Sequence, residues 1–137
     1  MTQEQKDLLL KDLCARIPYS VKMNHIADDE ISPKTLIGIA KDMITLESSA
    51  GYSCVDVEHY KPYLFPLSSM TEEQKADCPI GETNLNIIIS NIGCYGIIEI
   101  PWRLSYLFVD WCNKNHFDYR GLIPLGLAED ATGKNIY

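Results

Sequence analysis

An amphipathic helix is predicted by one stretch, Trp102-Arg103-Leu104-Ser105-Tyr106-Leu107-Phe108-Val109-Asp110-Trp111-Cys112-Asn113-Lys114-Asn115. Its apolar side chains recur every three or four residues and form one stripe, which consists of Leu104, Leu107, Phe108, Trp111 and Cys112. Pro101 comes just before, and proline is tolerated in the first turn of a helix because the N–H that it lacks would be unpaired there. We expect this helix to bury Leu104, Phe108 and Trp111 against another layer of the protein.

Four short segments earlier in the chain predict the strands of that layer. In each segment apolar and polar side chains alternate, which is the period of a half-buried strand; the segments are residues 19–24, 35–40, 42–47 and 53–58. Ile44 and Leu46 share one face of the third segment, and Val55 and Val57 face inward in the fourth. Because the connections are short, we expect mostly antiparallel pairing in a meander or a small barrel.

A second helix is predicted over residues 3–16. Thr2 and Gln5 have the spacing of a capping box, and Pro18 ends the helix because a proline disfavours helical geometry in the residue before it. The side chains expected on its buried face are Leu9, Leu10, Leu13, Cys14 and Ile17.

The middle of the chain is predicted to hold a connector, a short helix and a hairpin. Residues 61–66 contain two prolines, which lack the backbone donor that a central strand needs, so this segment is expected to be a packed connector. Ser69 and Glu72 have capping-box spacing and predict a short helix over residues 70–76. Alternating apolar residues within residues 85–100 predict a β-hairpin.

These elements predict an α+β fold. A small, mostly antiparallel sheet or an SH3-like barrel would carry the N-terminal helix and the C-terminal amphipathic helix packed on it. The chain has 137 residues, of which 46% are hydrophobic and 23% charged, and this is enough to form one core. We therefore expect a single domain over residues 1–137.

Charge and cysteine content limit the classes of partner. The formal net charge is −7, which disfavours binding to the phosphates of nucleic acid. The apolar runs are too short to span a membrane, and residues 1–7 do not resemble a signal peptide. The 5 cysteines form an odd set without a repeated short spacing and are expected to be thiols. These features favour a cytoplasmic protein.

One group of polar residues is dense enough to be a candidate site. His116, Asp118, Tyr119 and Arg120 place an imidazole, a carboxylate, a phenol and a guanidinium within five residues, a set that could bind an anion or transfer protons. Lys61 and Tyr63 could contribute from the connector, and they complete a candidate binding set of His116, Asp118, Tyr119, Arg120, Lys61 and Tyr63. The alternative is structural: the aromatic residues anchor the turn, Asp118 caps it and Arg120 pairs with a carboxylate.

No catalytic residue, metal or cofactor is expected. Cys112 and His116 stand four residues apart and could both face a metal ion, but two ligands do not complete a zinc site. The sequence contains neither a phosphate-binding loop with its Lys-Ser/Thr pair nor a dinucleotide fingerprint. No signature of a cysteine hydrolase is present either.

Three segments resemble a family of small proteins encoded by anaerobic gut bacteria, often in prophage-like or other mobile regions. They cover residues 8–19, 60–73 and 113–137 and include KPYLFPLSSMTEE at 61–73 and NHFDYRGLIPLGLA at 115–128. The resemblance brings no activity, cofactor or catalytic residue to this chain. It implies a mobile-element setting only.

The function expected from these observations is that of a non-enzymatic interaction module, an accessory protein of a mobile element that binds another protein. One alternative is an enzyme or small-ligand binder that uses the cluster from His116 to Arg120. Another is an acidic mimic of nucleic acid directed at a DNA-binding protein, which would draw on the net charge of −7.

Overall fold

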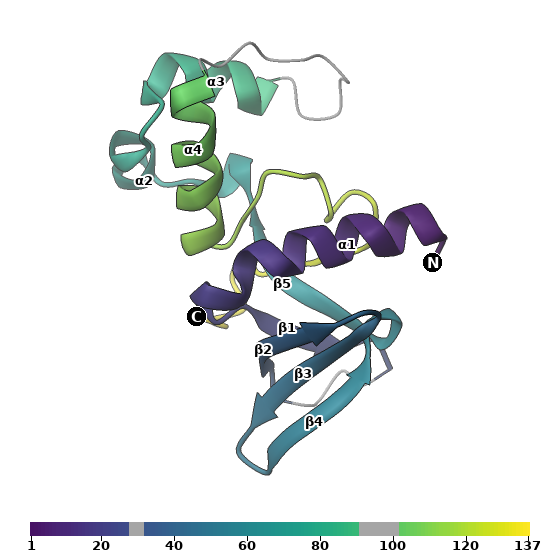
Figure 1. Ribbon diagram of the computed structural model, residues 1–137. Coiled ribbons are helices and arrows are strands. Elements are labelled where there is room, and N and C mark those ends of the chain that lie inside the picture. The colour runs from purple at the N-terminus through teal and green to yellow at the C-terminus, as the bar shows by residue number, and fades with distance from the viewer. Residues whose placement is uncertain (28–31, 91–101) are drawn as a thin grey trace.

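The computed structural model describes residues 1–27, 32–90 and 102–137. Within these ranges, one helix lies across a seven-stranded sheet, and the other helices gather at one end of a long strand (Figure 1). The helices are α1 (Gln3–Arg16), α2 (Glu72–Asp77), α3 (Gly81–Ser90) and α4 (Trp102–Lys114). The strands are β1 (Lys22–His25), β2 (Lys34–Ala40), β3 (Met43–Ser48), β4 (Gly51–Asp56), β5 (Tyr60–Pro66), β6 (Phe117–Asp118) and β7 (Glu129–Asp130). Three 3-10 turns are η1 (Ile17–Tyr19), η2 (Val57–His59) and η3 (Leu67–Ser69). The predicted α+β class is confirmed.

The strands β1 to β4 form the predicted antiparallel meander. Ile44 and Leu46 are fully buried, as their alternation predicts, and Val57 is buried in the turn η2 that follows β4. β5 pairs antiparallel with β1, whereas β6 and β7 pair with β5 in parallel. In the described ranges the strand order β4-β3-β2-β1-β5-β6 does not close on itself. Of the two predicted forms, the described residues thus have the mostly antiparallel sheet, which is open, and not the SH3-like barrel.

Helix α1 has the predicted limits and the predicted cap. The Thr2 hydroxyl accepts a hydrogen bond from the Gln5 amide at 3.2 Å, and the Gln5 side chain accepts one from the Thr2 amide at 2.9 Å. After η1, Ser20 adopts a left-handed conformation with φ 56° and turns the chain into β1. The first strand consequently begins at Lys22 and not at residue 19.

The buried face of α1 differs from the predicted one. Cys14 is exposed, and the buried positions include three charged residues; they are Lys6, Leu9, Asp12, Leu13 and Arg16. Leu9 and Leu13 are completely buried against the sheet, and each such side chain stabilises the fold by about 2 kcal/mol. The charged residues are buried because they pair with groups on other elements, which an apolar pattern does not report.

The prediction of a connector at residues 61–66 is wrong, because these residues form the central strand β5. The Ile26 amide donates to the His59 carbonyl at 2.9 Å, and hydrogen-bonded positions alternate along an antiparallel pair. Pro62, which lies opposite Met23, is therefore at a position whose nitrogen faces away from β1. On the opposite side of β5, pairing with β7 begins only at Tyr63. The backbone N–H that Pro62 lacks is therefore not needed for either neighbouring strand.

The prediction of a hairpin is wrong in its first half, where the chain forms the helix α3. Leu85 and Ile88 are buried, three residues apart, whereas Ile87 is 45% exposed. A strand would have placed residues 85 and 87 on the same face, but helical spacing separates them by more than half a turn. The second half of the predicted hairpin lies outside the described residues.

The short helix α2 begins two residues after the predicted start. Its capping box is formed by Thr71 and Gln74 and not by Ser69 and Glu72. The Ser69 hydroxyl instead donates to the Pro66 carbonyl at 2.7 Å in the preceding turn. Both pairs have the capping-box spacing, so only the three-dimensional path of the chain distinguishes them.

Two apolar clusters hold these layers together. One lies between α1 and the sheet and includes Leu9, Leu13, Ile44, Leu46 and Leu64. The other joins α3 and α4 to η3 and β6 and includes Leu67, Leu85, Phe108, Cys112 and Phe117.

Helix α4 contacts the sheet at the edge strand β6, where the Trp111 ring stacks on Phe117 with centroids 5.4 Å apart. The predicted contact of Phe108 and Trp111 is thus made with this edge and with the neighbouring helices, while the side chain of Leu104 lies outside the described residues. None of the helices in the described ranges combines the length and the apolar character needed to span a bilayer.

Candidate functional site

The predicted site residues begin at the turn that follows α4. The His116 amide donates to the Asn113 carbonyl at 3.3 Å, and His116 has φ 60°, a left-handed conformation that few residues other than glycine adopt. This reversal directs Phe117 and Asp118 into β6. There the Phe65 amide of β5 donates to the His116 carbonyl at 2.9 Å, so the turn is fastened to the sheet.

Asp118 holds the backbone that follows β6. Its two carboxylate oxygens accept hydrogen bonds from the amides of Leu122 and Ile123, each at 2.8 Å, and only 5% of the residue is exposed. Both oxygens are therefore occupied by the chain itself. Asp118 acts as the predicted cap of the next turn.

Tyr119 and Arg120 belong to a buried ionic network centred on α1. Asp12 and Arg16 are fully buried and form a bidentate ion pair at 2.6 and 3.2 Å, and the Arg120 guanidinium lies 3.2 Å from the same carboxylate. The centre of the Tyr119 ring lies 5.5 Å from the Arg16 guanidinium and 4.9 Å from the Arg120 guanidinium. Burial raises the pKa of the Tyr119 phenol, so it remains protonated at neutral pH.

Asp12 and Arg16 are the members of this network that sequence reasoning missed. Their spacing of four residues on a helix is the one signal that could have found them. Exposed ion pairs with this spacing are common. The sequence pattern does not indicate that this pair is buried next to β6.

His116 lies against Tyr137, the last residue of the sequence. The two rings are stacked with centroids 3.8 Å apart and planes 12° from parallel. Burial, together with the positive charges of Arg16 and Lys22, lowers the pKa of His116 from 6.5 to about 4. Its Nδ1 is buried and has no hydrogen-bond partner among the described residues. The imidazole is consequently neutral at pH 7.

The Tyr137 hydroxyl connects this turn to β1 and β5. It accepts a hydrogen bond from the Lys22 amide at 3.1 Å and donates one to the Tyr63 carbonyl at 2.7 Å. Lys22 and Tyr63 follow the last direct pair of the two strands, Met23 and Pro62. The Tyr137 hydroxyl therefore takes the place of the next backbone hydrogen bond between β1 and β5, from the Lys22 amide to the Tyr63 carbonyl.

Lys61 and Tyr63 lie on β5 but do not join the His116–Arg120 cluster as a common pocket. The Lys61 ammonium lies 3.7 Å from the Glu129 carboxylate of β7, and the Tyr63 side chain is buried beneath the Lys134 ammonium, 5.3 Å from its ring centre. Only the backbone carbonyl of Tyr63 approaches His116, through Tyr137.

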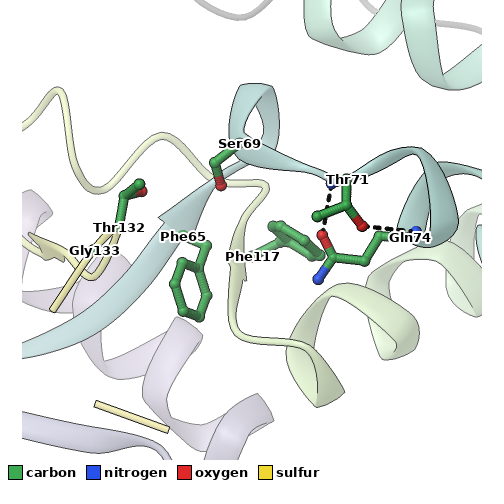
Figure 2. A pocket seen from close by; sticks show the side chains of 7 residues that line it. All are labelled: Phe65, Ser69, Thr71, Gln74, Phe117, Thr132 and Gly133. Carbon is green, nitrogen blue, oxygen red and sulfur yellow. Dashed lines mark hydrogen bonds between the residues drawn. The ribbon is translucent and has the colours of Figure 1, made fainter. Parts of the chain in front are cut away.

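A small cavity of about 200 Å³ lies beside the cluster and contains none of the predicted site residues (Figure 2). Its lining comes from β5, η3, α2, β6 and the C-terminal segment and consists of Phe65, Ser69, Thr71, Gln74, Phe117, Thr132 and Gly133. The polar groups of Thr71 and Gln74 bond to each other's backbone, as the dashed lines of Figure 2 show. Two of the lining side chains, Phe65 and Phe117, are aromatic rings, and we call this space the aromatic cavity.

A metal centre at Cys112 and His116 finds no third ligand. Within residues 1–27, 32–90 and 102–137, no three His, Cys, Asp or Glu side chains lie close enough together to hold a metal ion. Cys112 is fully buried, and burial strongly raises the pKa of its thiol, which opposes the thiolate form that metals bind.

A different surface is formed by β4, the edge strand at the far end of the meander (Figure 1). The Val57 amide donates to the Asp42 carbonyl at 3.0 Å, and β4 continues from there in regular register along β3. Because bonded positions alternate, the N–H and C=O groups of Tyr52 and Cys54 point away from β3. No described element pairs with them.

The side chains of this edge are also open to solvent. Tyr52 is 73% exposed, and Cys54 and Met43 are exposed on the same face of the sheet. Edge strands are usually protected from pairing by lysine, proline or a bulge, and β4 has none of these. Sequence reasoning predicted the strand but could not tell that it lies at an edge.

Comparison with protein-family models, curated proteins and solved structures finds no significant match.

Proposed function

We propose that this chain is a non-enzymatic protein-interaction module that binds an extended segment of a partner protein along β4. The observation that carries the proposal is the row of backbone groups at Tyr52 and Cys54 that no described element uses. A partner strand would satisfy these groups and extend the sheet, which is the common mode of strand addition. Tyr52 would supply an aromatic contact next to the added strand.

The charges around this edge favour a basic partner segment. Lys6 lies within 3.7 Å of three carboxylates, those of Asp42, Asp56 and Glu58, at the end of β4. Glu47, which pairs with Tyr52 across the strands, adds a fourth carboxylate. Besides Lys6, the second positive charge is Lys41 in the turn between β2 and β3. Four negative charges thus face two positive ones, and complementary lysine or arginine residues would accelerate association and fix the register.

The setting that we propose follows from the sequence. The resemblance of residues 8–19, 60–73 and 113–137 supports an accessory role in a mobile element, with a host or phage protein as the partner. Four cysteines, Cys14, Cys54, Cys78 and Cys112, are free thiols, which supports action in the reducing cytoplasm.

The direct test is to pan a random-peptide display library against the whole chain. Peptides that bind are expected to be extended and basic, and to shift the amide resonances of Tyr52 and Cys54 in the bound state. In the double variant Tyr52→Lys/Cys54→Lys, two charges are placed on the edge where natural proteins use them to prevent pairing, so affinity should fall at least about tenfold.

Tyr106→Lys is the matched control, because Tyr106 is 60% exposed on α4 and lies away from the sheet edge. It should bind the same peptides as the unchanged chain. If no peptide is enriched, or if the enriched peptides bind the double variant equally well, the proposed function is wrong.

A further inference from the structure

We infer that residues 131–137 form a clasp over the aromatic cavity, which is closed while the Tyr137 ring covers His116 and opens when His116 takes up a proton. This is a regulated conformational change separate from the binding edge at β4. It would control access to the cavity that Phe65 and Phe117 line.

Tyr137 fastens the end of the clasp. The Tyr137 hydroxyl bridges the Lys22 amide and the Tyr63 carbonyl, and its ring lies 5.9 Å from Phe65 as well as on His116. Even so, 44% of Tyr137 is exposed. Its release nevertheless costs two hydrogen bonds, one ring stack and the burial of its phenol, which raises the pKa of the hydroxyl.

The segment before Tyr137 is shaped to hinge. The Ala131 amide donates to the Leu64 carbonyl at 2.8 Å and ties the base of the clasp to β5. Gly133 then adopts φ 74°, a conformation that glycine reaches without strain. Residues 132–135 are exposed, and the Lys134 ammonium lies 3.6 Å from Glu129 in a surface ion pair.

The surroundings of His116 oppose a positive charge on its imidazole. The charged groups that act on it are Arg16 from α1 and Lys22 from β1, and both are cations. The Tyr137 ring, which is neutral at pH 7, covers one side of the imidazole, and β5 contacts His116 through the Phe65 amide, which donates to its carbonyl. Asp12, the carboxylate next to Arg16, is already paired with Arg16 and Arg120.

The direction of the pH effect follows from these contacts. In the closed state the pKa of His116 is lowered to about 4, whereas an imidazole exposed by opening returns toward 6.5. The open state thus binds the proton first as the pH falls. Opening is favoured progressively from about pH 6.5 down to about pH 4, and the opening equilibrium changes by at most about 300-fold over this window.

Opening would change the cavity itself. Thr132 and Gly133 form one wall, on the opposite side from Thr71 and Gln74 in Figure 2. When the clasp turns about Gly133, the Tyr137 ring leaves the Phe65 ring, which is only partly buried in the closed form and becomes more exposed. In the closed form, therefore, the C-terminal segment of the chain itself covers part of the aromatic cavity.

The experiment is an NMR titration of the whole chain from pH 7.5 to pH 3.5, which follows the histidine ring carbons and the backbone order of residues 134–137. We expect these residues to be ordered at neutral pH and to become mobile as His116 is protonated, while far-UV circular dichroism stays constant. In Tyr137→Ala the His116 midpoint should rise by about two pH units.

His116→Asn supplies the second variant, because asparagine tolerates the left-handed conformation but does not titrate. Its residues 134–137 lose the ring stack but keep the two hydrogen bonds of Tyr137, so their order should not change with pH between 7.5 and 4. The inference is overturned if the segment stays ordered in the unchanged chain, if it loosens equally in His116→Asn, or if it loosens only together with global unfolding.

Discussion

Arg16 donates a hydrogen bond to the Phe117 carbonyl at 2.8 Å, and these residues are separated by 101 positions in the sequence. The contact joins the end of α1 to β6 and places a fully buried guanidinium under the turn that begins at His116. The same guanidinium pairs with Asp12. A residue of the N-terminal helix α1 thus bonds directly to the backbone of the predicted site cluster.

Replacing Arg16 by methionine is expected to lower the free energy of unfolding by about 3 kcal/mol, because it leaves the Asp12 carboxylate buried with Arg120 as its remaining partner. Urea denaturation measures the loss. The double variant Asp12→Leu/Arg16→Met should recover part of it, since the fully buried carboxylate is gone and Arg120, which loses this partner, is 23% exposed and reaches solvent. Lys75→Ala breaks the exposed pair with Glu72 and should cost less than about 0.5 kcal/mol. Equal losses in Arg16→Met and Lys75→Ala would contradict the buried network.

Asp118→Ala should cost about 2 to 3 kcal/mol, because the buried amides of Leu122 and Ile123 lose a charged acceptor. Asp118→Asn keeps one acceptor oxygen and should lose about half as much. Asp130→Ala is the matched control: its carboxylate also accepts from a backbone amide, that of Thr132, but in an exposed turn. Thermal and urea unfolding of the three variants check the order. Asp118 has no special structural role if all three are equally stable.

Leu85→Ala and Ile87→Ala distinguish a helix from a strand in this part of the chain. In α3, Leu85 is fully buried and Ile87 is 45% exposed. The first substitution should therefore cost about 2 to 4 kcal/mol and the second less than about 1 kcal/mol. A strand would bury both residues on one face, so similar losses in the two variants would favour the hairpin after all.

The four cysteines of the described residues are expected to react in two classes. Cys14 and Cys54 are exposed, whereas Cys78 and Cys112 are buried and burial raises the pKa of both thiols. Iodoacetamide at pH 8 should alkylate the first pair within minutes and the second pair only in urea, since the thiolate is the reacting form. Mass spectrometry of the proteolytic peptides locates the label. Fast labelling of Cys112 in the native protein would show that α4 does not pack as described.

Much of the fold could be read from local pattern. The capping box at Thr2 and Gln5 located the start of α1, and the alternation around Ile44 and Leu46 located β3 and its buried face. These signals are reliable because each depends on residues close together in the chain. The site cluster was also visible as a dense set of polar residues, and Asp118 has the capping role that the structural alternative predicted.

Other features could not be read in this way. Alternation in residues 85–89 predicted a strand, but short apolar runs fit either period, and packing against Phe108 and Leu67 selected the helix. Two prolines argued against a strand at residues 61–66. Pro62 is accommodated only because its nitrogen faces away from β1 at this register.

The sequence by itself determined the α+β class, the ends of α1 and the composition of the turn from His116 to Arg120, because each is set by neighbouring residues. The tertiary structure decided that Asp12 and Arg16 are buried beneath that turn, that β4 is an edge, and that Tyr137 covers His116. These relationships join residues far apart in the chain, and the free energy of burying a charge or a ring depends on what the fold places beside it.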